Sequence, residues 1–370
     1  MRTRLVAAFV ALVLVAAVVV FANRHDPEEA LATTSFTTTS STSTTSTSTT
    51  TTTAPPPPTT VPPTAPPRTA PPTTRRTTTV PPAPTTTGSV VPYSPLRTNA
   101  PIVAGDPTQF RGLGAWIDVY DWSNEFTKNN PTVGPSDVDR MKDLGVQTLF
   151  VQAAKKASPN DVVDINLLRP IINRAHKNGM RVITWYAPTL EDPTLDLRKL
   201  EAIAALDVEG VGVDIESRAV SDVPERTRRL IDLSIAFRQR VPTKALAAVV
   251  MPAVQMEVIN PNYWPGFPYR DIAPAYDAWM PMDYWTSRTP QSGYRDAYRY
   301  TAENMDRLRA DVGRPDLPVH PIGGIADASS PDDVDAFRRA AQERGAFGGS
   351  LYDFHTTGDA LWAPMQPFRS

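Results

Sequence analysis

The sequence predicts an α/β protein whose folded part is a (β/α)8 TIM barrel, preceded by an N-terminal hydrophobic helix and a disordered Thr/Pro-rich stalk. Three observations lead to this prediction. Residues 5–22 are uninterruptedly apolar, and 45 of the 55 residues in 33–87 are Thr, Ser or Pro. Beyond residue 98, short apolar runs alternate with helical patterns. We therefore divide the chain into segments 1–24, 25–97 and 98–370.

The apolar run 5–22 follows Arg2 and Arg4. A helix of this length spans roughly 27 Å, close to the thickness of a bilayer core. The arginines favour a cytoplasmic N-terminus, so the rest of the chain is expected outside. A signal peptide ending at Ala22 is the alternative. Both interpretations predict an extracellular protein, anchored in the membrane if the helix is uncleaved and secreted otherwise.

The tract 33–87 has almost no apolar side chains to offset the entropy of ordering it, so we expect it to stay solvated. Its prolines favour extended polyproline II. In an exported protein such a tract serves as a stalk.

Charge and composition exclude several classes of protein and of functional site. The net charge is −2, and segment 33–97 holds four Arg and no acid, so the acidic excess falls elsewhere in the chain. An acidic domain has no footprint for nucleic acid. The absence of Cys excludes disulfides, zinc-thiolate sites and thiol nucleophiles. His176 falls within a predicted helix, and His320 and His355 are isolated, so we expect no metal site. We also expect a protein without a cofactor, and a monomer.

Eight strand candidates carry the barrel prediction, with starts 29 to 40 residues apart. They are 113–119, 146–152, 180–186, 210–216, 245–251, 278–284, 318–324 and 347–353. Amphipathic helices are predicted over 167–178, 224–240 and 331–344, the last with the pair Ser329-Ser330 as a cap. Segment 257–275 is irregular and predicts a loop with a short helix. A doubly wound open sheet is the rival fold.

The fourth strand ends in two acids. Catalytic residues of such barrels lie where strands end. In 209–216, alternation turns Val211, Val213 and Ile215 toward the helices and Asp214 and Glu216 inward. Two neighbouring carboxylates raise the pKa of at least one of them, which suits a general acid. Pairing with arginines near the barrel mouth is the alternative.

This strand resembles glycoside hydrolase family 18, the chitinase-like barrels, whose fourth strand reads D-G-x-D-x-D-x-E. Asp214 and Glu216 match, whereas Glu209 and Gly212 replace the first two acids. Strand six, 279–284, resembles the family's M-x-Y-D. Met280 and Asp283 match there, and Met282 stands where the family has Tyr.

The resemblance implies that Glu216 protonates the glycosidic oxygen while Asp214 orients the substrate's N-acetyl group. Asp283 is the third catalytic candidate, and Asp283 or Tyr284 would replace the missing tyrosine. The implied substrate is a β-linked, N-acetylated polysaccharide.

A second resemblance lies in strand one. Residues 115–119, Ala-Trp-Ile-Asp-Val, are similar to the G-I-D-V-S opening of family 25 lysozymes. This implies a muramidase acting on peptidoglycan, with Asp118 inward beside Trp116. A loop-capping carboxylate is the alternative for Asp118.

Polar and aromatic side chains cluster at the predicted strand ends, where flat rings could stack on sugars. The substrate-binding candidates are Asp118, Trp116, Tyr186, Gln152, Tyr284, Trp285 and Tyr352. Core packing is the alternative for the aromatics.

Two other functions fit parts of the sequence. The glycines at 323, 324, 345, 348 and 349 resemble the phosphate cradle after strands seven and eight of metabolic barrels. A noncatalytic sugar-binding barrel on the cell surface fits the departures at Glu209, Gly212 and Met282. The retained Asp214 and Glu216 favour an extracellular glycoside hydrolase.

Overall fold

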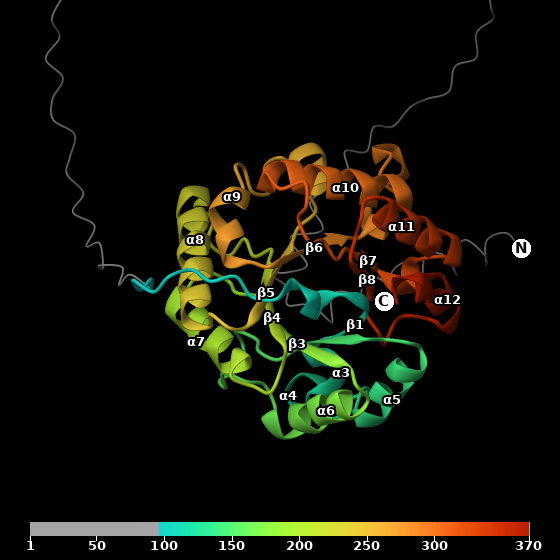
Figure 1. The fold of residues 1–370 in the computed structure, drawn as a ribbon, viewed down its shortest axis with the longest axis horizontal. Coiled ribbons are helices and arrows are strands. Elements are labelled where there is room, and N and C mark those ends of the chain that lie inside the picture. The colour runs from blue at the N-terminus through green and yellow to red at the C-terminus, as the bar shows by residue number, and fades with distance from the viewer. Residues whose placement is uncertain (1–95, 370) are drawn as a thin grey trace, which may run out of the picture. The chain divides into compact units, whose positions relative to one another are not determined.

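The computed structural model describes residues 96–369, and these form a closed barrel of eight parallel strands in chain order (Figure 1). The strands are β1 (Gly112–Ile117), β2 (Thr148–Gln152), β3 (Arg181–Tyr186), β4 (Gly210–Ile215), β5 (Ala245–Val250), β6 (Ala278–Asp283), β7 (Ile322–Gly324) and β8 (Gly348–Tyr352). β8 pairs with β1 and closes the barrel, which confirms the (β/α)8 part of the predicted fold and excludes an open doubly wound sheet.

Helices surround the barrel on its outside (Figure 1). They are α3 (Val119–Trp122), α4 (Asn124–Thr127), α5 (Pro135–Asp143), α6 (Ile165–Lys177), α7 (Pro193–Ala204), α8 (Val223–Arg240), α9 (Tyr269–Ile272), α10 (Ala297–Val312), α11 (Pro331–Glu343) and α12 (Trp362–Met365). Predicted helices 167–178, 224–240 and 331–344 correspond to α6, α8 and α11. At α11, Ser330 accepts a hydrogen bond from the Asp333 amide, so the predicted cap is confirmed.

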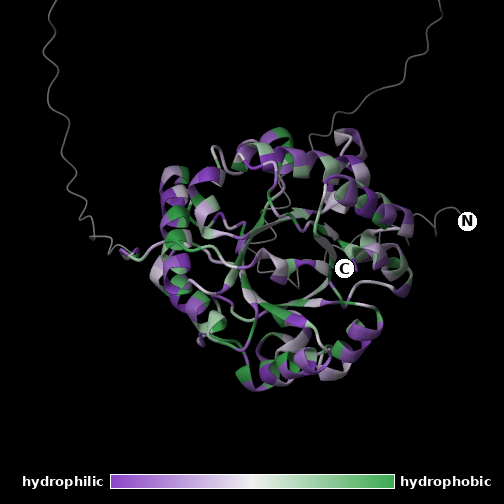
Figure 2. Ribbon diagram, viewed as in Figure 1, coloured by the Kyte–Doolittle hydropathy of each residue, from purple (hydrophilic) through white to green (hydrophobic). Residues whose placement is uncertain are grey.

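Alternate residues of each strand form the barrel interior. The interior cluster contains Trp116, Phe150, Ile183, Trp185, Ala245, Ala247, Val249, Ala278, Met280, Met282 and Ile322. The intervening strand residues face outward, as Trp279 does, which packs against Tyr269 of α9 and Tyr276 just before β6. Figure 2 shows the resulting pattern, with hydrophobic residues on the strands and hydrophilic residues on the helix exteriors.

The segment before β1 closes the barrel at the N-terminal ends of the strands. Phe110 is fully buried in the interior cluster, and its carbonyl lies 2.7 Å from Nδ1 of His320. Gly105 donates to Asp277 at the start of β6. The segment crosses in front of the strands in Figure 1, so this face is opposite the ends where the predicted site lies.

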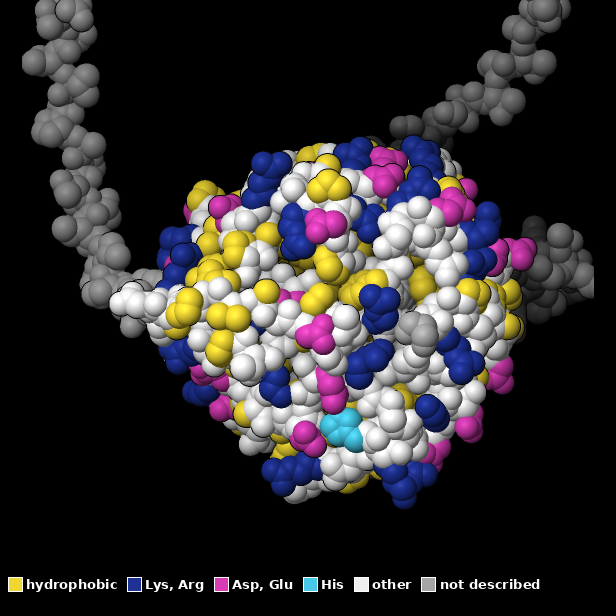
Figure 3. All heavy atoms as spheres, viewed as in Figure 1, with side chains coloured by type: hydrophobic (Ala, Val, Ile, Leu, Met, Phe, Trp, Pro, Cys, Tyr) yellow, Lys and Arg dark blue, Asp and Glu magenta, His cyan; other side chains and the backbone are white. Residues whose placement is uncertain are grey.

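Figure 3 shows this closed face from outside. Lys and Arg side chains alternate there with Asp and Glu, and neither sign covers the face.

Prolines shorten β7 relative to the predicted 318–324. Pro318 and Pro321 have no N–H to donate to a ladder, so regular pairing begins only at Ile322. Between β5 and β6 the chain is irregular, as predicted, with one π-helical turn (Gln255–Ile259) and the short α9.

The predicted anchor, the predicted stalk tract 33–87 and the first predicted segment boundary, between residues 24 and 25, lie outside the described part of the chain. Within residues 96–369, no helix combines the length and apolar character needed to span a bilayer.

Candidate active site

The two acids at the end of the fourth strand lie on the inner face of the barrel, as alternation predicts. Gly212 precedes Asp214 by two residues, and a Cβ on Gly212 would meet Trp185 and Val249, both members of the interior cluster. Asp214 is 8% exposed, and Glu216 is half-buried directly after the strand. Glu216 is therefore the more accessible of two carboxyl groups on one face.

Tyr284 lies beside this pair. It follows β6, is half-buried and packs against the interior cluster, two positions beyond the inward Met282. Burial raises the pKa of the Tyr284 hydroxyl well above its usual value, and the nearby carboxylates of Asp214 and Glu216 raise it further. The hydroxyl stays protonated and can donate a hydrogen bond.

A second group joins β1 to β8 at the same mouth. The Tyr352 hydroxyl donates to Oδ2 of Asp118 at 2.8 Å. Burial, and next the Asp118 carboxylate, raise the pKa of Tyr352 well above its usual value. The Tyr352 and Tyr284 rings lie 6.0 Å apart. The two tyrosines therefore lie side by side at the mouth, one bonded to Asp118 and the other within the electrostatic influence of the acids of β4.

Asp118 is also held by its own loop. Its Oδ1 accepts from the Tyr120 amide at 2.8 Å, and its amide donates to Asp121 Oδ2 at 3.1 Å. The capping alternative is thus correct for one oxygen of Asp118, while the other oxygen bonds Tyr352. Gln152 is buried, and its amide oxygen accepts from the Val119 amide at 3.1 Å. Gln152 thereby fixes the loop that carries Asp118.

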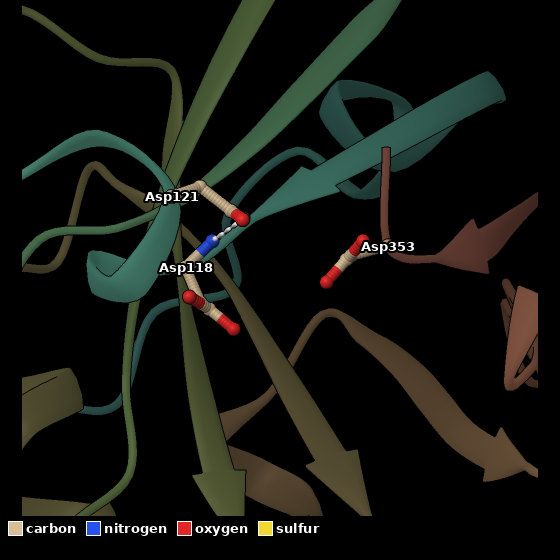
Figure 4. Close-up of side chains that lie close together, drawn as sticks. All are labelled: Asp118, Asp121 and Asp353. Atoms are coloured by element: carbon tan, nitrogen blue, oxygen red, sulfur yellow. Dashed lines mark hydrogen bonds between the residues drawn. The ribbon is translucent and has the colours of Figure 1, made fainter. Parts of the chain in front are cut away.

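Three carboxylates converge at this edge of the mouth. One oxygen each of Asp118, Asp121 and Asp353 lie within 4.8 Å of one another, and all three residues are buried (Figure 4). Asp353 follows β8 and accepts from the Thr356 amide at 2.9 Å. Carboxylate oxygens are the ligands of hard divalent cations, so this is where such an ion would fit. The protein hydrogen bonds to each carboxylate also account for the cluster as local structure.

Three predicted site residues lie elsewhere, which corrects the prediction. Asp283, Tyr186 and Trp285 all point outward, toward the helices. Asp283 is fully buried and accepts from Asn304 of α10 at 2.8 Å. The Tyr186 hydroxyl donates to Asp196 of α7 at 2.6 Å, and Trp285 packs against Phe337 of α11.

Trp116 faces inward as predicted but offers no surface to a ligand. It is 2% exposed, stacks on Phe150 with ring centroids 4.4 Å apart, and donates from Nε1 to Ser350 Oγ. Ser350 Oγ also lies 3.0 Å from His320 Nε2. Trp116 is thus a core residue that supports Tyr352, whose ring centroid lies 6.4 Å away.

Sequence reasoning missed Asp353 and assigned no position to Trp185. Asp353 immediately follows the last residue of β8, so the strand-end rule applied to β8 could have found it. Trp185 shares the parity of Ile183 and faces inward. The alternation of inward and outward side chains along β3, counted from Ile183, could have placed Trp185 on the inner face.

Three glycines of the proposed phosphate cradle, Gly323, Gly348 and Gly349, serve packing. A Cβ on Gly323 would lie 2.8 Å from the Trp285 ring, and one on Gly349 would lie 2.5 Å from Phe368. A Cβ on Gly348 would lie 2.6 Å from the Gly112 carbonyl oxygen. These glycines allow close approach of neighbouring groups, which explains them without a phosphate.

No protein-family model matches the chain, and no curated protein sequence matches it. Solved structures share its fold. The spore cortex-lytic enzyme SleL of Bacillus cereus superimposes with a TM-score of 0.52 at 9% identity, over 72% of this chain and 75% of that one. A class V chitinase from Pseudomonas fluorescens Pf-5 gives a TM-score of 0.50 at 10% identity, over 69% of this chain and 98% of that one. The chain thus has the TIM-barrel fold seen in glycoside hydrolases.

Proposed function

We propose that this barrel is a glycoside hydrolase that cleaves a β-linked, N-acetylated cell-wall polysaccharide, with Glu216 as general acid/base. The observation that carries the proposal is the pair Asp214 and Glu216 on the inner face at the end of β4. Tyr284 lies beside the pair, and Asp118 with Tyr352 lies across the mouth. These groups come from four strands and meet where TIM-barrel chemistry occurs.

The half-buried Glu216 is the group that a bound glycan would reach. In its protonated form it gives its proton to the glycosidic oxygen as the C–O bond breaks. The carbonyl oxygen of the substrate's acetamido group attacks the anomeric carbon, and Asp214 orients that group. Water then opens the cyclic intermediate after giving a proton to Glu216, which restores the acid. Tyr284 is placed to donate to the acetamido oxygen in the role that Met282 cannot fill.

The structural neighbours agree with a wall polysaccharide as substrate. One is named for lysis of the spore cortex and the other as a chitinase. We further propose that the enzyme acts outside the cell, tethered by the N-terminal helix or secreted. That part of the proposal rests on the sequence of residues 1–97.

The test measures reducing ends released by the full chain from chitin oligomers, peptidoglycan and β-glucans. Glu216→Gln should lower turnover at least about 100-fold, because it removes the transferable proton. Glu209→Gln is the matched control. Its carboxylate lies at the opposite end of β4, where it accepts from the Val182 amide. It should keep turnover within about 2-fold of wild type.

Each outcome decides between functions. Release from peptidoglycan alone would favour the lysozyme-like alternative over the chitinase-like one. If wild type releases nothing while both variants bind glycan equally well, the catalytic proposal fails and the barrel is a binding protein.

A further inference from the structure

Tyr263 joins the irregular crossover between β5 and β6 to the end of the catalytic strand. Its ring is fully buried, and its hydroxyl donates to the backbone carbonyl of Glu216 at 2.6 Å. Glu216 lies just beyond the last paired residue of β4, because the ladder to β5 ends at Ile215. The strand ladder therefore does not fix the backbone at Glu216, and the Tyr263 hydroxyl holds its carbonyl.

The crossover is itself held firmly on the barrel exterior. Arg226 of α8 is 2% exposed, and its Nη2 donates to the Tyr263 carbonyl at 3.0 Å. The Arg226 guanidinium also lies 4.3 Å from the centroid of the Trp264 ring. Trp264 Nε1 donates to Thr227 Oγ1 at 3.0 Å. Tyr263 thus extends from a fixed base rather than from a free loop.

The electrostatics keep Tyr263 a hydrogen-bond donor. Burial raises the pKa of its hydroxyl above the usual value, and the Glu216 carboxylate nearby raises it further, with a smaller contribution from Asp214. The exposed Arg218 guanidinium lies 5.2 Å from the ring centroid and opposes this shift. The hydroxyl consequently stays protonated at neutral pH and donates the hydrogen bond.

We propose that Tyr263 is a positioning residue for Glu216, which makes the fifth crossover part of the catalytic apparatus. This inference rests on the proposed function. By holding the carbonyl, the hydroxyl limits rotation of the Glu216 backbone and so fixes where its carboxyl group meets the glycosidic oxygen. Small displacements of an acid group lower turnover without changing how the substrate binds elsewhere.

The closing experiment compares Tyr263→Phe with Tyr276→Phe in the full chain. Tyr276 is also buried, and its hydroxyl lies 2.9 Å from Ser234 Oγ of α8. Tyr276→Phe therefore also removes one hydroxyl contact, but one that lies between α8 and the residues before β6. Tyr263→Phe should lower kcat about 3- to 10-fold with KM nearly unchanged, and should shift the basic limb of the pH–rate profile, which reports the loss of the Glu216 proton. Tyr276→Phe should leave kcat, KM and the pH profile at wild-type values.

A second readout is independent of turnover. The carbon-13 resonance of the Glu216 side-chain carboxyl, assigned by its loss in Glu216→Gln, is titrated in both tyrosine variants. Tyr263→Phe should shift its midpoint or chemical shift, and Tyr276→Phe should not. If wild type shows no turnover on any glycan, the proposed function fails, and this titration still decides whether Tyr263 positions Glu216.

Equal effects of the two variants on kcat, or an unchanged Glu216 titration in Tyr263→Phe, would overturn the inference. Arg218→Gln covers the case in which Tyr263→Phe does not fold, because Arg218 is exposed and its guanidinium lies over the Tyr263 ring. It should lower kcat about 2-fold and shift the same resonance in the same direction. Unchanged values of both would also overturn the inference.

Discussion

Replacing Asp277 with Asn should destabilise the barrel more than any loss of a surface ion pair. Asp277 precedes β6 and pairs with Arg238 of α8 at 2.5 Å, with side chains 3% and 0% exposed. Asp277 Oδ1 also accepts from the Gly105 amide at 2.6 Å, and Oδ2 accepts from the Leu246 amide at 2.8 Å. One carboxylate thus joins the N-terminal segment, α8 and β5.

The size of the effect follows from these contacts. Asn removes the negative charge and leaves the Arg238 guanidinium buried with two carbonyl acceptors, those of Ala275 and Lys244. In either orientation, the NH2 group of the new amide faces one of the two backbone N–H groups, of Gly105 or Leu246, that now donate to Asp277. Breaking a buried ion pair from one side costs about 3–5 kcal/mol, and the orphaned N–H is part of that cost.

The measurement is urea unfolding of the full chain, followed by circular dichroism. Asp277→Asn should lower the free energy of unfolding by about 3–5 kcal/mol with an unchanged m-value. Asp359→Asn is the matched control. Its partner is Arg140 and the side chains are 83% and 54% exposed, so its loss should cost under about 1 kcal/mol. Equal, small losses in both variants would refute the reasoning that burial determines the cost.

Two further predictions concern the barrel wall and the mouth. Burial raises the pKa of Asp196 to about 6, although the hydrogen bonds that Asp196 accepts from Tyr186 and Leu190 lower it in part. Its stabilising contribution is therefore full below about pH 4 and lost as pH rises through about 6. The free energy of unfolding of wild type relative to Asp196→Asn should fall by roughly 3 kcal/mol between pH 4 and 7, and parallel pH curves would contradict this. Tyr352→Phe removes the bond to Asp118 and should lower turnover about 3- to 10-fold, whereas Tyr298→Phe, which loses a bond to Glu343 between α10 and α11, should not.

Most of the barrel could be predicted because its strands repeat one physical pattern. Short apolar runs at near-constant spacing, separated by amphipathic helices, leave few arrangements other than a closed parallel sheet. β7 was predicted too long because Pro318 and Pro321 lie within the predicted run, and hydropathy does not register a missing N–H. The crossover 257–275 could be recognised as irregular, but its contact with Glu216 joins residues 47 positions apart in sequence. No local pattern encodes such a contact.

The candidate site could be predicted only where parity was applied. Alternation placed Asp214 and Glu216 on the inner face. The same rule applied to β6 puts Asp283 on the side of Trp279, which faces the helices. The motif resemblance placed Asp283 in the site because it compares residue identities and takes no account of the side on which each side chain lies. Tyr284, one residue later, has the inward parity of Met280 and Met282.

Asp283 also shows why a perturbed pKa does not by itself mark a catalytic acid. Burial raises its pKa well above the usual value, its Oδ2 has no hydrogen-bond partner within the described residues, and the bond from Asn304 opposes the shift only in part. If residues were ranked only by how far their pKa is shifted, Asp283 would be among the first candidates for the catalytic acid. Yet it lies between β6 and α10, where no glycan can enter without separating strand from helix. An acid catalyst needs access as well as a proton, and at the end of β4 the half-buried Glu216 has an inner-face position that Asp283 lacks.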